Sequence, residues 1–126
     1  MTQTGKAPLA GRRVLVVEDR YFIANEICDV LGGLGAEVVG PYPDVDGAQK
    51  GADAGGLDLA VLDVNLEGEM INPVVETLEQ RGVPFIFVTG YDDWVLPEPW
   101  RARPRLTKPV SRQALTDEVL KVLRKA

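Results

Sequence analysis

Histidine is absent from the sequence, and cysteine occurs once among the 126 residues. Without an imidazole there is no Ser-His-Asp or Cys-His nucleophile, no His-ligated zinc or haem, and no phosphohistidine donor. The lone Cys28 excludes an internal disulfide framework and is typical of a reducing compartment. Acid, base or metal chemistry in this chain must therefore use carboxylates, hydroxyls and amines.

Long apolar runs and targeting signals are also missing. No run approaches the roughly 18 apolar residues that a membrane span needs, and residues 1–10 lack the charged and then apolar layout of a signal peptide. The chain is 45% apolar and 26% charged, which is ordinary for a globular domain. We expect one cytoplasmic domain over residues 11–126, preceded by an N-terminal tail over residues 1–10, with no membrane partner.

Charge is distributed unevenly along the chain. Residues 101–126 contain eight Lys or Arg and two acidic residues, a net charge of +6, so that residues 1–100 have a net charge of −11 within the total of −5. This basic end can be a solvated last helix, favoured by its own dipole, or a docking surface for an acidic partner. The domain is acidic overall and has no stripe of interleaved basic and aromatic residues, so we expect no nucleic-acid partner.

Apolar runs alternate with helical patterns along the chain. Pro41 and Pro43 are expected to close the second strand, Pro73 lies in the first turn of the third helix, and Ser111 is a candidate N-cap of the last helix. The runs predict strands over residues 14–17, 36–39, 57–62, 84–88 and 105–107. The helical patterns predict helices at residues 23–34, 44–51 and 70–80 and after residue 111.

Continuous apolar strands separated by helices indicate a parallel sheet that is covered on both faces. The predicted fold class is therefore α/β, with a doubly wound five-stranded sheet. One segment departs from the alternation, because three prolines lie between Tyr91 and Arg105. A fourth helix there would be short or irregular and would last at most a turn or two before Pro97.

Polar side chains directly follow four of the predicted strands. In an open parallel sheet, the carboxyl ends of the strands form the ligand-binding edge, so these side chains are expected to share one pocket. An Asp or Thr after a strand is, taken alone, more often a turn former or helix cap. The residues at these strand ends are Glu18, Asp19, Asp63, Thr89 and Lys108.

The charges of this set indicate its chemistry. Three carboxylates a few ångströms apart repel one another and favour a cation between them, and an all-oxygen site is typical of Mg²⁺. Lys108 adds a fixed positive charge and Thr89 a hydroxyl donor, groups that stabilise a phosphoryl group in transfer. A carboxylate can also act as a nucleophile and form an aspartyl phosphate. No phosphate-binding glycine loop of either common type is present.

Four segments together resemble the receiver domain of two-component response regulators, in the CheY-like superfamily, over nearly the whole chain. The resemblance implies a flavodoxin-like sheet with strand order 2-1-3-4-5. It also implies that the domain takes a phosphoryl group from the phosphohistidine of a histidine kinase. The segments are Val14–Asp19, Leu59–Asp63, Val88–Gly90 and Leu106–Pro109.

The same resemblance implies a role for each site residue. Asp63 would be the phosphoacceptor, and Mg²⁺ would be held by Glu18, Asp19, Asp63 and the backbone carbonyl of Asn65. Thr89 and Lys108 would contact the phosphoryl oxygens, and the bond before Pro109 would be cis.

A narrower likeness lies in the segment Pro84–Tyr91, which is similar to the PFxFATGY pattern of the "FAT GUY" single-domain receivers, with Val88 in place of the alanine. This group is linked to general stress signalling in alphaproteobacteria. One position departs from the wider receiver pattern: Arg105 stands where most receivers have the aromatic switch residue. We hypothesise that Tyr91 and the segment 92–104 reorganise instead when Asp63 is phosphorylated.

The sequence thus favours a stand-alone receiver that is not an enzyme, apart from its self-catalysed phosphorylation and dephosphorylation. Its output would be contact with a downstream regulator or phosphotransferase protein. Trp94 and Trp100 could anchor such a contact or could belong to the core. Two alternatives stay open, a pseudo-receiver that binds partners without phosphorylation and a Mg²⁺-dependent phosphatase-like enzyme.

Overall fold

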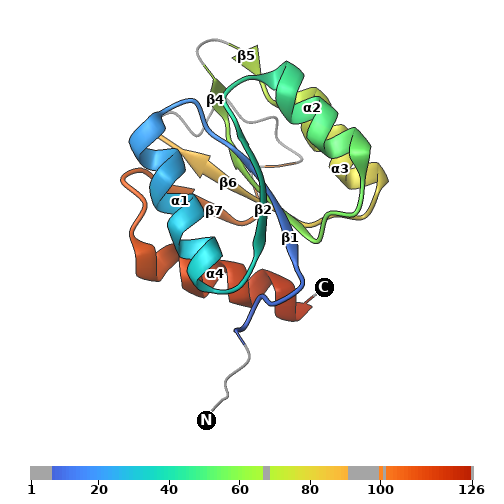
Figure 1. The fold of residues 1–126 in the computed structure, drawn as a ribbon. Coiled ribbons are helices and arrows are strands. Elements are labelled where there is room, and N and C mark those ends of the chain that lie inside the picture. Colours follow the sequence, from blue (N-terminus) through green and yellow to red (C-terminus); the bar gives the residue numbers. More distant parts are fainter. Residues whose placement is uncertain (1–6, 67–68, 91–99, 101, 126) are drawn as a thin grey trace.

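The computed structural model describes residues 7–66, 69–90, 100 and 102–125. A five-stranded parallel sheet forms the centre of the domain, with strand order β2-β1-β3-β6-β7 (Figure 1). Because β6 and β7 are the fourth and fifth strands of this sheet along the chain, the expected order 2-1-3-4-5 is confirmed. The strands are β1 (Arg13–Val17), β2 (Glu37–Tyr42), β3 (Leu59–Asp63), β6 (Phe85–Thr89) and β7 (Arg105–Thr107).

Helices cover both faces of the sheet, as expected for a doubly wound fold (Figure 1). Helices α1 and α4 pack with one apolar cluster, and α2 and α3 pack with a second cluster on the opposite face. The three central strands are buried almost throughout, which explains their continuous apolar sequences. The helices are α1 (Tyr21–Gly33), α2 (Val45–Ala54), α3 (Asn72–Gln80) and α4 (Arg112–Lys125). None of the helices in the described ranges is long and apolar enough to cross a membrane.

Side-chain caps define where two helices begin. The Asp44 carboxylate accepts a hydrogen bond of 2.8 Å from the Gly47 N–H at the start of α2. The Ser111 hydroxyl accepts one of 2.9 Å from the Ala114 N–H at the start of α4, which confirms the predicted cap.

The second strand and the third helix depart from the sequence prediction. Strand β2 does not close before Pro41 but continues to Tyr42, which an edge strand allows because its outer side needs no donor. Helix α3 begins at Asn72 rather than at Met70. Met70 instead lies in a two-stranded antiparallel hairpin of β4 (Asn65–Leu66) and β5 (Glu69–Met70), which the sequence did not indicate.

The packed part of the chain starts before residue 11. Leu9, in the expected tail, is buried against the cluster of α1 and α4, and its N–H donates to the Leu34 carbonyl at 2.8 Å. On the opposite face of the sheet, Trp100 is 7% exposed and belongs to the cluster of α2 and α3, so it lies in the core and does not offer a surface anchor. The expected short fourth helix, with Tyr91 and Trp94, lies outside the described residues.

Candidate functional site

Four strands deliver the predicted polar residues to one edge of the sheet. Glu18 and Asp19 directly follow β1, Asp63 ends β3, Thr89 ends β6, and Lys108 directly follows β7. Because β1, β3, β6 and β7 are parallel neighbours, these positions lie along the same carboxyl edge. Glu18, Asp63 and Thr89 are all buried, so the edge holds a recessed polar site.

Lys108 is the cation of this site. Its Nζ lies 3.2 Å from Asp63 Oδ2 and 3.3 Å from Glu18 Oε2, and it donates a hydrogen bond to each. The Lys108 backbone N–H donates to the Thr89 carbonyl at 2.7 Å, which fixes the start of the lysine loop against β6. With Glu18 2% and Asp63 1% exposed, the ammonium partly neutralises two carboxylates that water cannot reach freely.

The carboxylates also fit a divalent cation. Glu18, Asp19 and Asp63 each offer one oxygen, and the three oxygens lie within 4.8 Å of one another. Glu18 Oε1 and Asp19 Oδ1 are buried and have no hydrogen-bond partner among the described residues. Buried oxygens that lack a donor are costly unless a ligand satisfies them. A hard cation with oxygen ligands, such as Mg²⁺, would satisfy these atoms.

Burial changes the acidity of Glu18. Desolvation, with the nearby Asp63 charge as the second cause, raises the pKa of Glu18 from its ordinary value of 4.5 to about 7. The backbone N–H of Arg20, which donates to Glu18 Oε2 at 3.1 Å, and the Lys108 charge both oppose this rise. A cation that binds here therefore displaces a proton from Glu18 over part of the neutral range.

Comparison with solved structures gives the family. No protein-family model matches the chain, and no curated protein matches it. The solution structure of SdrG from Sphingomonas melonis Fr1 matches 94% of this chain and 99% of its own, with 37% identity and a TM-score of 0.80. The PhyR response regulator REC domain from Erythrobacter litoralis matches 91% of this chain and 92% of its own, with 27% identity and a TM-score of 0.79. The chain belongs to the response regulator receiver domains.

This receiver domain is also similar to an activated relative. The BeF3-activated conformation of SdrG from Pseudomonas melonis Fr1 matches 90% of this chain and 98% of its own, with 37% identity and a TM-score of 0.75.

Several residues that the family resemblance singled out can be placed. The Lys108–Pro109 peptide bond is cis, as the resemblance implies. Asn65 begins the β4–β5 hairpin two residues after Asp63, with its backbone paired to Met70. Arg105 is exposed in β7 and pairs in register with Phe87 of β6. Tyr91, the proposed switch residue, lies outside the described residues.

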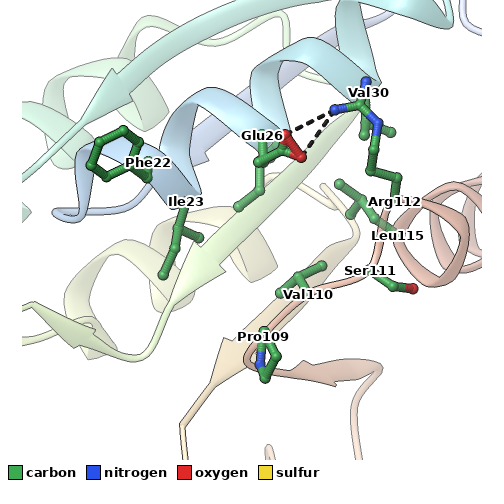
Figure 2. A pocket seen from close by; sticks show the side chains of 10 residues that line it. Phe22, Ile23, Glu26, Val30, Pro109, Val110, Ser111, Arg112 and Leu115 are labelled. Atoms are coloured by element: carbon green, nitrogen blue, oxygen red, sulfur yellow. Dashed lines mark hydrogen bonds and ion pairs between the residues drawn. The ribbon is translucent and has the colours of Figure 1, made fainter.

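An apolar groove of about 200 Å³ lies between α1 and the start of α4, beside the acidic site. Figure 2 shows Ile23 and Glu26 of α1 on one side and Val110 and Leu115 on the other, with Arg112 paired to Glu26. The groove starts next to the site, because one of its lining residues, Pro109, directly follows Lys108. Sequence reasoning missed this groove, since helical periodicity accounts for Ile23 and Leu115 as ordinary core residues.

Exposed aromatic and apolar side chains lie on the segments that follow the site residues in the chain. Tyr21 and Phe22, 72% and 82% exposed, begin α1, separated by one residue from Glu18 and Asp19, and Met70 is exposed on the hairpin that follows Asp63. These three are the large exposed hydrophobics in the described part of the chain. Exposed large hydrophobic side chains that follow site residues this closely in the chain are typical of a protein contact.

Proposed function

We propose that this receiver domain accepts a phosphoryl group on Asp63 from the phosphohistidine of a histidine kinase and signals through a partner protein. The observation that carries the proposal is a buried Asp63 carboxylate at the end of the central strand, 3.2 Å from Lys108 and within the acidic cluster of Glu18 and Asp19. The chain itself has no histidine, so the donor must be another molecule. We place the reaction in the cytoplasm.

In the proposed step, a carboxylate oxygen of Asp63 attacks the phosphorus atom. The new O–P bond forms as the N–P bond of the phosphohistidine breaks, and the departing imidazole nitrogen keeps the electron pair and takes up a proton. Lys108, already 3.2 Å from Asp63, is placed to stabilise the charge on the phosphoryl oxygens. The buried Thr89 hydroxyl, at the end of the neighbouring strand, is the second donor for these oxygens.

The acidic cluster would hold Mg²⁺ through Glu18, Asp19 and Asp63, with the backbone carbonyl of Asn65 as a further ligand. The cation, when bound, neutralises charge on the phosphoryl oxygens during transfer. The protein's own contribution is to keep Glu18 and Asp19 in place and to exclude competing donors from the buried oxygens.

The donor protein must reach a carboxylate that is only 1% exposed, so it must contact the rim of the site. We propose that it does so over the exposed Phe22 and the groove beside Pro109, where an apolar side chain of the donor fits. The likeness of Pro84–Tyr91 to the "FAT GUY" pattern, together with the similarity to SdrG and PhyR, supports a role in the general stress response. The downstream partner would be a regulator or a phosphotransferase protein.

Intact mass after incubation with acetyl phosphate, with and without Mg²⁺, tests the proposal. The wild type is expected to gain a Mg²⁺-dependent phosphoryl adduct, and Asp63→Asn to gain none. Asp117→Asn, which changes an exposed carboxylate on α4, is the matched control and should behave as the wild type. If neither acetyl phosphate nor a panel of kinases produces an adduct, the phosphorylation-independent binding module is the better description. Steady turnover of a small phosphoester would instead show an enzyme, whereas we propose only slow hydrolysis of the aspartyl phosphate.

A further inference from the structure

The pairing of strand β2 with β1 is irregular near the end of β1 that leads to Glu18. Its residues pair in regular register with β1 up to Val39 opposite Leu15, but the next pair joins Val17 to Tyr42. Two residues of β1 therefore span three residues of β2, which is a bulge. Because side chains alternate along a strand, one extra residue reverses the face to which the following side chain points.

The bulge turns the Tyr42 ring toward helix α2. Tyr42 packs with the cluster of α2 and α3, the same cluster as Val39 three residues earlier. In a strand of unbroken alternation, positions 39 and 42 would face opposite sides of the sheet. The bulge therefore accounts for Tyr42 lying on the face of the sheet that α2 covers.

Helix α2 presents glycine where it meets this ring. A Cβ at Gly47 would lie 2.8 Å from the ring, and a Cβ at Gly51 would lie 2.7 Å from it. Both distances are shorter than Cβ atoms tolerate. Alanine favours a helix more than glycine does, so two glycines in this ten-residue helix need a reason. The reason is that only glycine leaves enough room for the Tyr42 ring.

The backbone of Tyr42 leads directly to the acidic site. Its carbonyl accepts a hydrogen bond of 3.0 Å from the Glu18 N–H, just beyond the end of β1. The Glu18 side chain is held separately by the Arg20 N–H at 3.1 Å and by Lys108. These contacts leave Glu18 Oε1 buried and without a partner, as a cation ligand would be.

We propose that Tyr42 is a positioning residue for Glu18: its ring, seated on Gly47 and Gly51, fixes the carbonyl that orients Glu18 toward the metal. The inference rests on the proposed function, because it assumes that Glu18 helps to bind Mg²⁺. Groups that orient metal ligands typically change metal affinity about 10-fold to 100-fold when they are altered.

The test measures the Mg²⁺ dissociation constant by calorimetric titration of folded variants. Gly47→Ala and Gly51→Ala are each expected to weaken Mg²⁺ binding about tenfold. Their added methyl groups meet different second neighbours, the Asp44 carboxylate and the Leu15 side chain, but both meet the Tyr42 ring. A shared loss of affinity therefore points to the ring.

Two controls accompany these variants. Gly33→Ala makes the same change in α1, where a Cβ would meet no atom within 4 Å, and it should leave the affinity unchanged. Tyr42→Phe keeps both the ring and the carbonyl, and it should retain the wild-type affinity. A second readout without metal is hydrogen exchange of the Glu18 amide, which should be faster in Gly47→Ala and Gly51→Ala than in Gly33→Ala.

Tyr42→Ala decides the question if the α2 variants do not fold, because it removes the ring without adding a clash. It should weaken Mg²⁺ binding and speed exchange at Glu18. Wild-type affinity and exchange in Tyr42→Ala, or in folded Gly47→Ala and Gly51→Ala, would overturn the inference while the proposed function stands. A wild type that binds no Mg²⁺ would overturn the proposed function, and the inference with it.

Discussion

The buried carboxylate of Glu18 should make the stability of the metal-free domain depend on pH in an unusual direction. Its pKa is about 7 in the folded protein, against an ordinary value of 4.5. The folded state therefore binds this proton more tightly than the unfolded chain does. As pH rises from 4.5 to 7, the unfolded chain releases the proton first, so the stabilisation from this group is lost with rising pH.

The size of the effect follows from the two pKa values. Integration between pH 5 and pH 8 gives a loss of about 2.5 kcal/mol in the free energy of unfolding. For a domain of this length, that loss lowers the melting temperature by about 9 °C. The Glu18 side chain is fully buried, so solvent screening reduces this figure little.

Denaturant unfolding of metal-free protein at pH 5 and pH 8 measures this difference. Glu18→Gln has nearly the same shape but no titrating group, so its stability should change little between the two pH values. At pH 8 this variant should be more stable than the wild type by about 3 kcal/mol. Saturating Mg²⁺ should remove the wild-type loss at pH 8, because the cation stabilises the ionised carboxylate.

Few other side chains of this sequence titrate between pH 5 and pH 8, so the measured change can be assigned to Glu18. With no histidine, the side chains that ordinarily titrate in this window are missing, and the pKa of Cys28 is raised above 9.0 by burial and by the charge of Asp29. Glu26→Gln, an exposed carboxylate on α1, is the matched control and should keep the wild-type pH dependence. Equal wild-type stability at pH 5 and pH 8, or the same loss in Glu18→Gln, would refute the reasoning.

Three further predictions concern the site and the core. Lys108→Met leaves Glu18 and Asp63 without their cation, so at pH 8 it should lower the metal-free stability by about 3 kcal/mol while titration with Mg²⁺ shows tighter binding. Trp100→Ala should lower the free energy of unfolding by about 3–5 kcal/mol, and a loss below 1 kcal/mol in denaturant unfolding would argue against a core role. Asp44→Ala removes the cap of α2 and should cost about 1 kcal/mol, with no change in the yield of phosphoryl adduct by intact mass.

Most of the parallel sheet could be predicted from the sequence. Strands β1, β3 and β6 lie within two residues of their apolar runs, because a strand buried on both faces needs an unbroken apolar sequence. The position of the candidate site could be predicted from the same pattern of apolar strands. Once the strands were placed, the carboxyl ends of parallel neighbours brought Asp63 and Lys108 to one edge.

What could not be predicted depends on tertiary contacts. A proline usually ends a strand, but the edge position of β2 removes the need for the Pro41 donor, and only the neighbouring strand reveals that edge. The β4–β5 hairpin is two residues a side, too short for any periodicity. The burial of Trp100 could not be predicted from the sequence either. Its ring packs near Phe87 and its Nε1 donates to Glu79 at 3.2 Å, and both residues are distant from Trp100 in the chain.

The irregular end of β2 also bears on solubility. An edge strand exposes unpaired N–H and C=O groups that can pair with a strand of another molecule. In β2, Pro41 has no N–H to offer, and the bulge interrupts the even spacing of the remaining groups. The regular stretch left open is Glu37–Val39, which begins with an exposed charge. This edge is therefore a poor template for intermolecular strand pairing, and the domain is protected there against aggregation.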